Sequence, residues 1–256
     1  MGKQNWKAGN MLYPVPAVMV SCKREGEKPN IITVAWAGTI CSDPAMVSIS
    51  VRRERYSYDI IKESKEFVIN LVTRDLLRAT DYCGVKSGRD TDKFKDMKLT
   101  PLASQHVSAP GISESPVNIE CKVSKIVHLG SHDMITAHVV GVTVDDAYMN
   151  NRGKFELNSA GLITYSHGEY FELGKKLGTF GYSVKKSGSS GQKATNRVIK
   201  KKSTKPGTKA GERSRSDASG KPKNSDSRNS GRSGSRGSSS SKSGNSFAST
   251  FAGKKR

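Results

Sequence analysis

The sequence has no long hydrophobic run. No apolar stretch approaches the roughly 18 residues that a membrane-spanning helix needs, and residues 1–10 contain no apolar core like that of a secretory signal. We therefore predict a protein without a transmembrane segment.

Cysteine is also scarce. The 4 cysteines are far apart and form no CxxC pair. They are Cys22, Cys41, Cys83 and Cys121. A domain of about 183 residues, as predicted below, builds a sufficient core without disulfides. We therefore expect reduced thiols and a cytoplasmic localisation. His128 and His132 lie four residues apart, outside any predicted helix and without an HExxH motif, and we predict no metal site.

Acidic residues are almost missing from one part of the chain. Residues 184–256 hold 20 basic and 3 acidic side chains, together with 19 serines, 10 glycines and only two aromatic residues. Such a segment buries too little apolar area to offset its ordering entropy, so we predict a disordered, basic C-terminal tail. Residues 1–183 hold 23 basic and 20 acidic side chains, and we predict that they form one globular domain.

Glycine-rich nucleotide fingerprints are missing as well. The chain contains neither GxGxxG after a strand nor GxxxxGK[ST]. This argues against a tightly held dinucleotide.

The first 183 residues read mostly as strands. Val47, Ile49 and Val51 alternate with polar residues, which is typical of a strand with one buried face. Further strands are predicted over residues 15–22, 31–40, 66–72, 117–123, 134–144, 162–166 and 170–173. Short helices are predicted to follow caps at Ser57 and Thr73, and residues 84–116 read as a long loop. The fold class is therefore mainly β: an antiparallel barrel with a few short helices.

Five sequence blocks occur in the order known from one family. They are NIITVAWAGTICSDP (30–44), SVRRERYS (50–57), FVIN (67–70), CGVKSG with DKF (83–94), and LG through FGYS (173–183). Together they resemble the flavin reductase-like, flavoredoxin-type FMN-binding family. The resemblance implies an antiparallel split β-barrel, bound FMN, and a homodimer with the flavin near the subunit interface.

The resemblance assigns two groups of residues to the flavin phosphate. Arg55 and Ser57 lie at a predicted helix start, where the helix dipole favours an anion. Ser87, Gly88 and Lys93 form a second, basic and glycine-bearing group. The alternative is that Ser57 only caps its helix and that the charges are merely solvated.

The flavin ring needs backbone donors where negative charge grows on reduction. The stretch from Trp36 to Ser42 matches that requirement by the same resemblance. Its candidate contacts are Trp36, Thr39, Ile40, Cys41 and Ser42. Trp36 could equally fill the core, and Cys41 is predicted as a pocket wall rather than a reactive thiol, since no cation or helix start stands beside it in sequence.

Two further polar residues have open roles. Asn70 ends a predicted strand and either reaches the ribityl chain or phosphate or serves as a turn residue. His132 lies in the predicted turn 130–133, where a histidine of the family often faces the nicotinamide or substrate side of the flavin; the alternative is an exposed turn residue.

Three functions follow as hypotheses. The first is an FMN-binding oxidoreductase that passes electrons from NAD(P)H, as a transient co-substrate, to a small-molecule or protein acceptor. The second is a flavoredoxin-like electron carrier that does not use NAD(P)H directly. The third is a nucleic-acid-binding protein in which the tail, residues 184–256, contacts RNA or another polyanion. The alternatives for the tail are a solubilising role without a fixed partner and contact with an anionic membrane or protein surface.

Overall fold

The computed structural model describes residues 2–185. The predicted tail therefore lies, apart from residues 184 and 185, outside the described residues. The chain divides into a compact unit that includes residues 2–176 and a second unit that includes residues 177–185, with one 3-10 turn at Tyr182–Val184. Among the described helices, none is long and apolar enough to cross a membrane.

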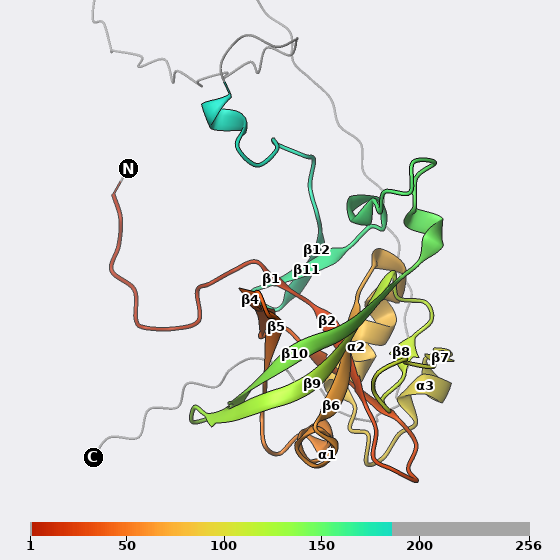
Figure 1. Cartoon of the computed structure of the whole chain (residues 1–256). Coiled ribbons are helices and arrows are strands. Elements are labelled where there is room, and N and C mark those ends of the chain that lie inside the picture. The colour runs from red at the N-terminus through yellow and green to blue at the C-terminus, as the bar shows by residue number, and fades with distance from the viewer. Residues whose placement is uncertain (1, 186–256) are drawn as a thin grey trace, which may run out of the picture. The chain divides into compact units, whose positions relative to one another are not determined.

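A seven-stranded antiparallel sheet forms the body of the first unit and curls on itself (Figure 1). Its strand order is β3-β2-β6-β9-β10-β5-β4. The strands are β2 (Val18–Cys22), β3 (Asn30–Val34), β4 (Ala37–Ser42), β5 (Ala45–Val51), β6 (Glu66–Leu71), β9 (Val117–His128) and β10 (Asp133–Val144). The predicted mainly β, antiparallel fold is confirmed.

Smaller elements complete the unit. A three-stranded sheet joins β1 (Val15–Pro16), β11 (Ile163–Ser166) and β12 (Glu169–Glu172), and β7 (Pro101–Leu102) pairs with β8 (Gly111–Ile112). The helices are α1 (Tyr56–Ser64), α2 (Leu77–Val85) and α3 (Lys93–Asp96). Short 3-10 turns cover Arg74–Leu76, Asp146–Tyr148 and Leu157–Ser159.

Four sequence-based assignments were wrong. The predicted strand over residues 15–22 is two strands, β1 and β2, which belong to different sheets. The predicted strand over residues 31–40 is two strands, because the chain leaves one edge of the sheet after Val34 and joins the opposite edge at Ala37. Helix α1 begins at Tyr56 with Arg55 as its N-cap, since Ser57 turns its hydroxyl inward. The predicted loop over residues 84–116 contains α3, β7 and β8, which are too short to leave a periodic signal.

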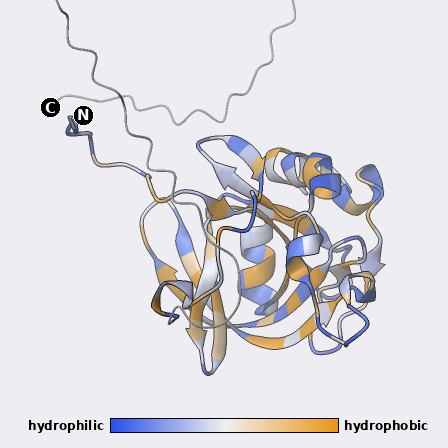
Figure 2. Cartoon of the chain, turned by 90° about the horizontal axis from the view of Figure 1, so that it is seen from above, coloured by the Kyte–Doolittle hydropathy of each residue, from blue (hydrophilic) through white to orange (hydrophobic). Residues whose placement is uncertain are grey.

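Two apolar clusters pack on the two faces of the curled sheet. The first fills the concave side with alternate residues of the strands and with Ile60 and Ile61 of α1. The second packs α2 against the other face through Met19, Ile31 and Cys83. Figure 2 shows the alternation as orange and blue bands along the ribbons. Full burial of each large aliphatic side chain contributes about 1.5–3 kcal/mol, so this alternation is what holds the sheet in its curled form.

Candidate functional site

Asn30 joins two of the predicted phosphate-binding groups. Its Nδ2 donates to Ser57 Oγ at 2.7 Å, in the first turn of α1. The loop at Gly88 packs against the same side chain so closely that a Cβ at position 88 would lie 2.1 Å from Asn30 Oδ1. The start of β3, the start of α1 and the loop at residue 88 therefore meet at one place.

Arginine side chains surround the start of α1. The guanidinium of Arg89 lies 5.3 Å from the Tyr56 ring centroid and donates to the Glu54 carbonyl at 3.3 Å. The guanidinium of Arg24 lies 5.9 Å from the same ring. Arg55 occupies the N-cap position itself. These cations lie where the helix dipole also favours negative charge.

A cavity of about 410 Å³ lies beside this cluster, lined in part by Asn30, Tyr56, Gly88 and Arg89. Its wall also includes the acidic residues Glu27, Asp90 and Asp92, of which Glu27 pairs with Arg24 and Asp92 with Lys28. Sequence reasoning missed Asn30, Tyr56 and Arg89 as members of this cluster. Arg89 directly follows the predicted Ser87 and Gly88, and that adjacency was the available signal. No sequence pattern links Asn30 to Ser57, because their contact spans 27 positions.

Lys93 and the Ser57 hydroxyl face inward. The Lys93 side chain is part of the interior, with only 3% of the residue exposed, and its ammonium donates to the carbonyls of Ile31 at 2.6 Å and Cys83 at 2.8 Å. Burial lowers the pKa of Lys93 to about 8. Lys93 thus ties α3 to β3 and α2, and Ser57 can offer only its backbone N–H to a ligand. Ser87 stays partly exposed, and its hydroxyl accepts from the N–H of Arg89 at 3.2 Å.

Asn70 lies in the core with 0% exposure. Its Nδ2 donates to the Met19 carbonyl at 2.9 Å, and its Oδ1 accepts from the Ile112 N–H at 2.9 Å and from Asn118 Nδ2 at 2.8 Å. These hydrogen bonds occupy the side-chain amide of Asn70 and connect β2, β6, β8 and β9. Asn70 therefore does not belong to the site described here.

Strand β4 carries the residues predicted to face the flavin ring. It is an edge strand of the seven-stranded sheet, and the register slips between Thr39 and Cys41, so Ile40 forms a bulge. Edge strands expose backbone donors and acceptors, and bulges often stand next to active sites. Thr39, Ile40 and Ser42 are exposed, while Cys41 is partly exposed and donates its thiol hydrogen to the Asp43 carbonyl at 3.3 Å.

Trp36 precedes β4 and packs in an aromatic group. Its ring centroid lies 6.0 Å from that of Tyr13, which in turn lies 4.4 Å from the His167 ring and 6.4 Å from the Tyr165 ring. The Trp36 carbonyl accepts from the Ser50 N–H at 2.8 Å. This bond connects the start of β4 to the end of β5, just before the arginine-rich turn that leads into α1.

The predicted turn between β9 and β10 is present and holds His132, which is half-buried. Burial, and then the charges of Arg52 and Arg55, lower the pKa of His132, so its ring is neutral at neutral pH. The Ser131 hydroxyl lies 2.9 Å from its Nδ1. The charges that act on His132 thus come from the turn before α1.

Asp133, which sequence reasoning missed, connects these two turns. Its carboxylate has 0% exposure and accepts from Arg53 Nε at 2.9 Å, from the Tyr58 hydroxyl at 2.6 Å and from His128 Nδ1 at 2.7 Å. Burial alone would raise its pKa, but these three hydrogen bonds outweigh burial and lower the pKa to about 2. The buried carboxylate therefore holds the turn before α1 against the β9–β10 turn.

Comparison with known proteins identifies the class of the chain. The family model of the flavin reductase like domain matches residues 10–174, so the chain belongs to this family. A protein of Archaeoglobus fulgidus is 31% identical over 160 residues, which is 62% of this chain and 88% of the relative.

Solved structures give the same result. Flavoredoxin of Desulfovibrio vulgaris (Miyazaki F) superposes with a TM-score of 0.67 and 31% identity, over 72% of this chain and 100% of that one. The NADH:FAD oxidoreductase SgcE6 of Streptomyces globisporus C-1027 shares the fold with a TM-score of 0.54 at 15% identity, over 64% of this chain and 88% of that one. The split-barrel fold expected from the sequence is thus confirmed.

Proposed function

We propose that the chain binds FMN between the start of α1 and the edge strand β4. The observation that carries this proposal is the meeting of Asn30, Ser57 and Gly88 beside the guanidinium group of Arg89, with Arg55 at the N-cap of α1. Guanidinium groups, a hydroxyl at Ser87 and the first backbone N–H groups of a helix are the donors that a phosphate requires. The donor set therefore fits the charged end of FMN.

The ring end of the flavin fits β4 by the same reasoning. Backbone groups along the outer edge of β4 and the exposed hydroxyls of Thr39 and Ser42 can donate to polar atoms of the ring. Trp36 stands beside that edge, half-buried, and can cover one side of the ring. His132 is neutral and lies in reach of the charged turn, where it can orient a second ligand without adding a positive charge.

When bound, FMN would supply hydride and electron transfer chemistry. The chain holds and orients the cofactor. We infer that NAD(P)H is the electron donor and that a small molecule or a protein is the acceptor. The likeness to an NADH:FAD oxidoreductase supports direct NAD(P)H use, while the likeness to flavoredoxin favours the second candidate, an electron carrier.

An anaerobic titration tests this proposal. Purified protein loaded with FMN should lose its yellow absorbance on addition of NADH or NADPH within the mixing time or over minutes, and recover it when air is admitted. Bleaching by a chemical reductant but by neither nicotinamide would favour the electron carrier. A protein that cannot be loaded with FMN would contradict both.

We further propose that the chain forms a homodimer, as the family resemblance implies. Exposed apolar side chains support this: Ile40 is 48% exposed, Val142 is 56% exposed and Leu12 is 87% exposed. Such side chains are commonly covered in a dimer interface. Light scattering should give twice the chain mass, and the same mass ratio should hold for a protein truncated after residue 183.

The basic segment supports a separate proposal, that residues 184–256 bind RNA or another polyanion. This segment carries 20 basic and 3 acidic side chains. Binding through neutralised phosphates falls steeply with salt. Truncation after residue 183 should abolish binding of single-stranded RNA at low salt and leave the FMN content unchanged. Equal RNA binding by the two proteins would contradict the proposal.

A further inference from the structure

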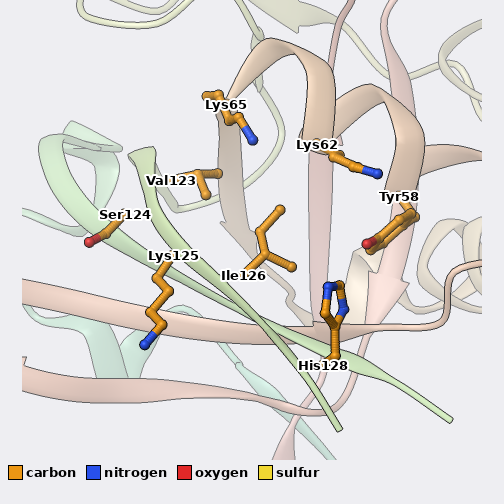
Figure 3. A pocket seen from close by; sticks show the side chains of 8 residues that line it. All are labelled: Tyr58, Lys62, Lys65, Val123, Ser124, Lys125, Ile126 and His128. Carbon is orange, nitrogen blue, oxygen red and sulfur yellow. The ribbon is translucent and has the colours of Figure 1, made fainter. Parts of the chain in front are cut away.

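A second cavity, of about 440 Å³, lies between the C-terminal half of α1 and strand β9. Figure 3 shows the side chains around it. Those that face it are Tyr58, Lys62, Lys65, Val123, Ile126 and His128, while Ser124 and Lys125 lie at its border and point away. The volume is within the range of small-molecule sites. None of the residues predicted to hold the flavin lines this cavity.

Lys62 and Lys65 give the rim of the cavity positive charge. Among residues 2–185, no carboxylate lies within 4.0 Å of the ammonium groups of Lys62 or Lys65. Two of the nearby carboxylates have other partners. Glu63 pairs with Arg24, and Glu66 accepts from the N–H and hydroxyl of Ser108.

The inner wall of the cavity is apolar. Val123 and Ile126 pack against the main core cluster, and the Tyr58 ring belongs to that cluster. A ligand that enters therefore meets aliphatic and aromatic carbon on the inside and ammonium groups at the rim. This pattern matches a molecule with an apolar body and one anionic group.

His128 is oriented toward the cavity by the buried carboxylate. Its Nδ1 lies 2.7 Å from Asp133 Oδ2, and the Tyr58 hydroxyl donates to the same oxygen at 2.6 Å. A carboxylate behind one ring nitrogen fixes the ring orientation and directs the other nitrogen outward. The imidazole is thus a third polar group on the cavity wall, next to Tyr58 and on the side away from Lys65 (Figure 3).

We propose that this cavity binds a small organic carboxylate, with the carboxylate group between Lys62 and Lys65 and the apolar body against Val123 and Ile126. The site is separate from the proposed flavin site, because the flavin residues gather at the start of α1 and this cavity lies along its second half. His128 contacts the ligand from the β9 side.

Fluorine NMR with fluorobenzoate as the probe tests the proposal on the full-length protein, both saturated with FMN and without added FMN. Binding should be saturable in both states. The double variant Lys62→Gln, Lys65→Asn should bind the probe roughly tenfold more weakly. Asparagine is chosen at position 65 because that residue has a φ of 59°, a conformation that asparagine tolerates.

The matched control is Lys95→Gln with Lys98→Asn. It removes the same two charges, and Lys98 has a φ of 55°, so the backbone demand is also matched. This control should bind fluorobenzoate within about twofold of the unmodified protein. The basic segment after residue 185 is identical in all three proteins, so its contribution to anion binding is common to them.

Three results would overturn the proposal. One is equal weakening in the two double variants, and another is the lack of saturable binding in the unmodified protein. The third is that fluorobenzyl alcohol, a neutral probe of the same shape, binds as tightly as fluorobenzoate. Because the measurement is made with and without FMN, a failure here is distinct from a failure to bind flavin.

Discussion

Replacement of Asp133 by Asn is expected to lower the midpoint of thermal unfolding by roughly 10 °C. The carboxylate is fully buried and accepts from Arg53, Tyr58 and His128, which come from three different elements. Asparagine replaces one acceptor oxygen with an NH₂ group, which is a donor and would face the donors that the carboxylate accepts from. Arg53 then loses a charged partner at the buried end of its ion pair.

The same carboxylate gives stability a specific pH dependence. The pKa of Asp133 is lowered in the folded protein from an ordinary value of 3.8 to about 2. The unfolded chain therefore takes up this proton first as the pH falls. The stabilisation is fully present above about pH 4 and is lost as the pH approaches 2.

Thermal melts of the unmodified protein and the Asp133→Asn variant, recorded from neutral pH downward, measure both effects. The difference between the two midpoints should shrink below about pH 4. Asp146→Asn, an exposed carboxylate on a 3-10 turn, serves as the control and should change the midpoint by no more than about 2 °C. A difference that stays constant with pH would contradict the assignment of the lowered pKa.

Replacement of Gly88 by Ala is expected to weaken FMN binding by roughly 10- to 100-fold. A Cβ at this position would lie 2.1 Å from Asn30 Oδ1 and 2.6 Å from Asn30 Cγ. Asn30 cannot simply turn away, because it is buried and its Nδ2 donates to Ser57. The loop at residue 88 must therefore move, and it carries Ser87 and Arg89 away from the start of α1.

Comparison of FMN with riboflavin locates the effect. The two ligands differ only in the phosphate. A displaced phosphate site therefore weakens the binding of FMN, while the affinity for riboflavin stays within about threefold of its original value. Fluorescence quenching titrations measure both affinities. Gly174→Ala is the control, since a Cβ at that position has no atom within 4 Å. Equal weakening of the two flavins would show that Gly88 acts on the fold and not on the phosphate.

The strands and their faces were predictable from the sequence, because burial of one face imposes a period of two. Val47, Ile49 and Val51 show this alternation, and all three are buried in the first core cluster. The crossing between β3 and β4 was not predictable, since only Ala35 and Trp36 separate the two strands and neither residue type marks a turn.

The orientation of individual polar side chains was harder to predict from the sequence than the strands. Lys93 reads as a surface charge in the sequence, and its inward direction depends on two carbonyls, one of which lies 62 positions away. The role of Asp133 depends on Arg53 and Tyr58, which are 80 and 75 positions away. Periodicity assigns a face to a residue but cannot report a hydrogen-bond partner that another element supplies.

The path of the chain from β3 into β4 has a consequence for ligand choice. Strand β3 begins at Asn30, beside the proposed phosphate position, and spans 5 residues, about 15 Å, before the chain passes into β4 and the proposed ring position. In the proposed site, the length of this backbone segment sets the distance between the positions for the two ends of the cofactor. We therefore expect the proposed site to select flavins by their length rather than by the strength of either contact.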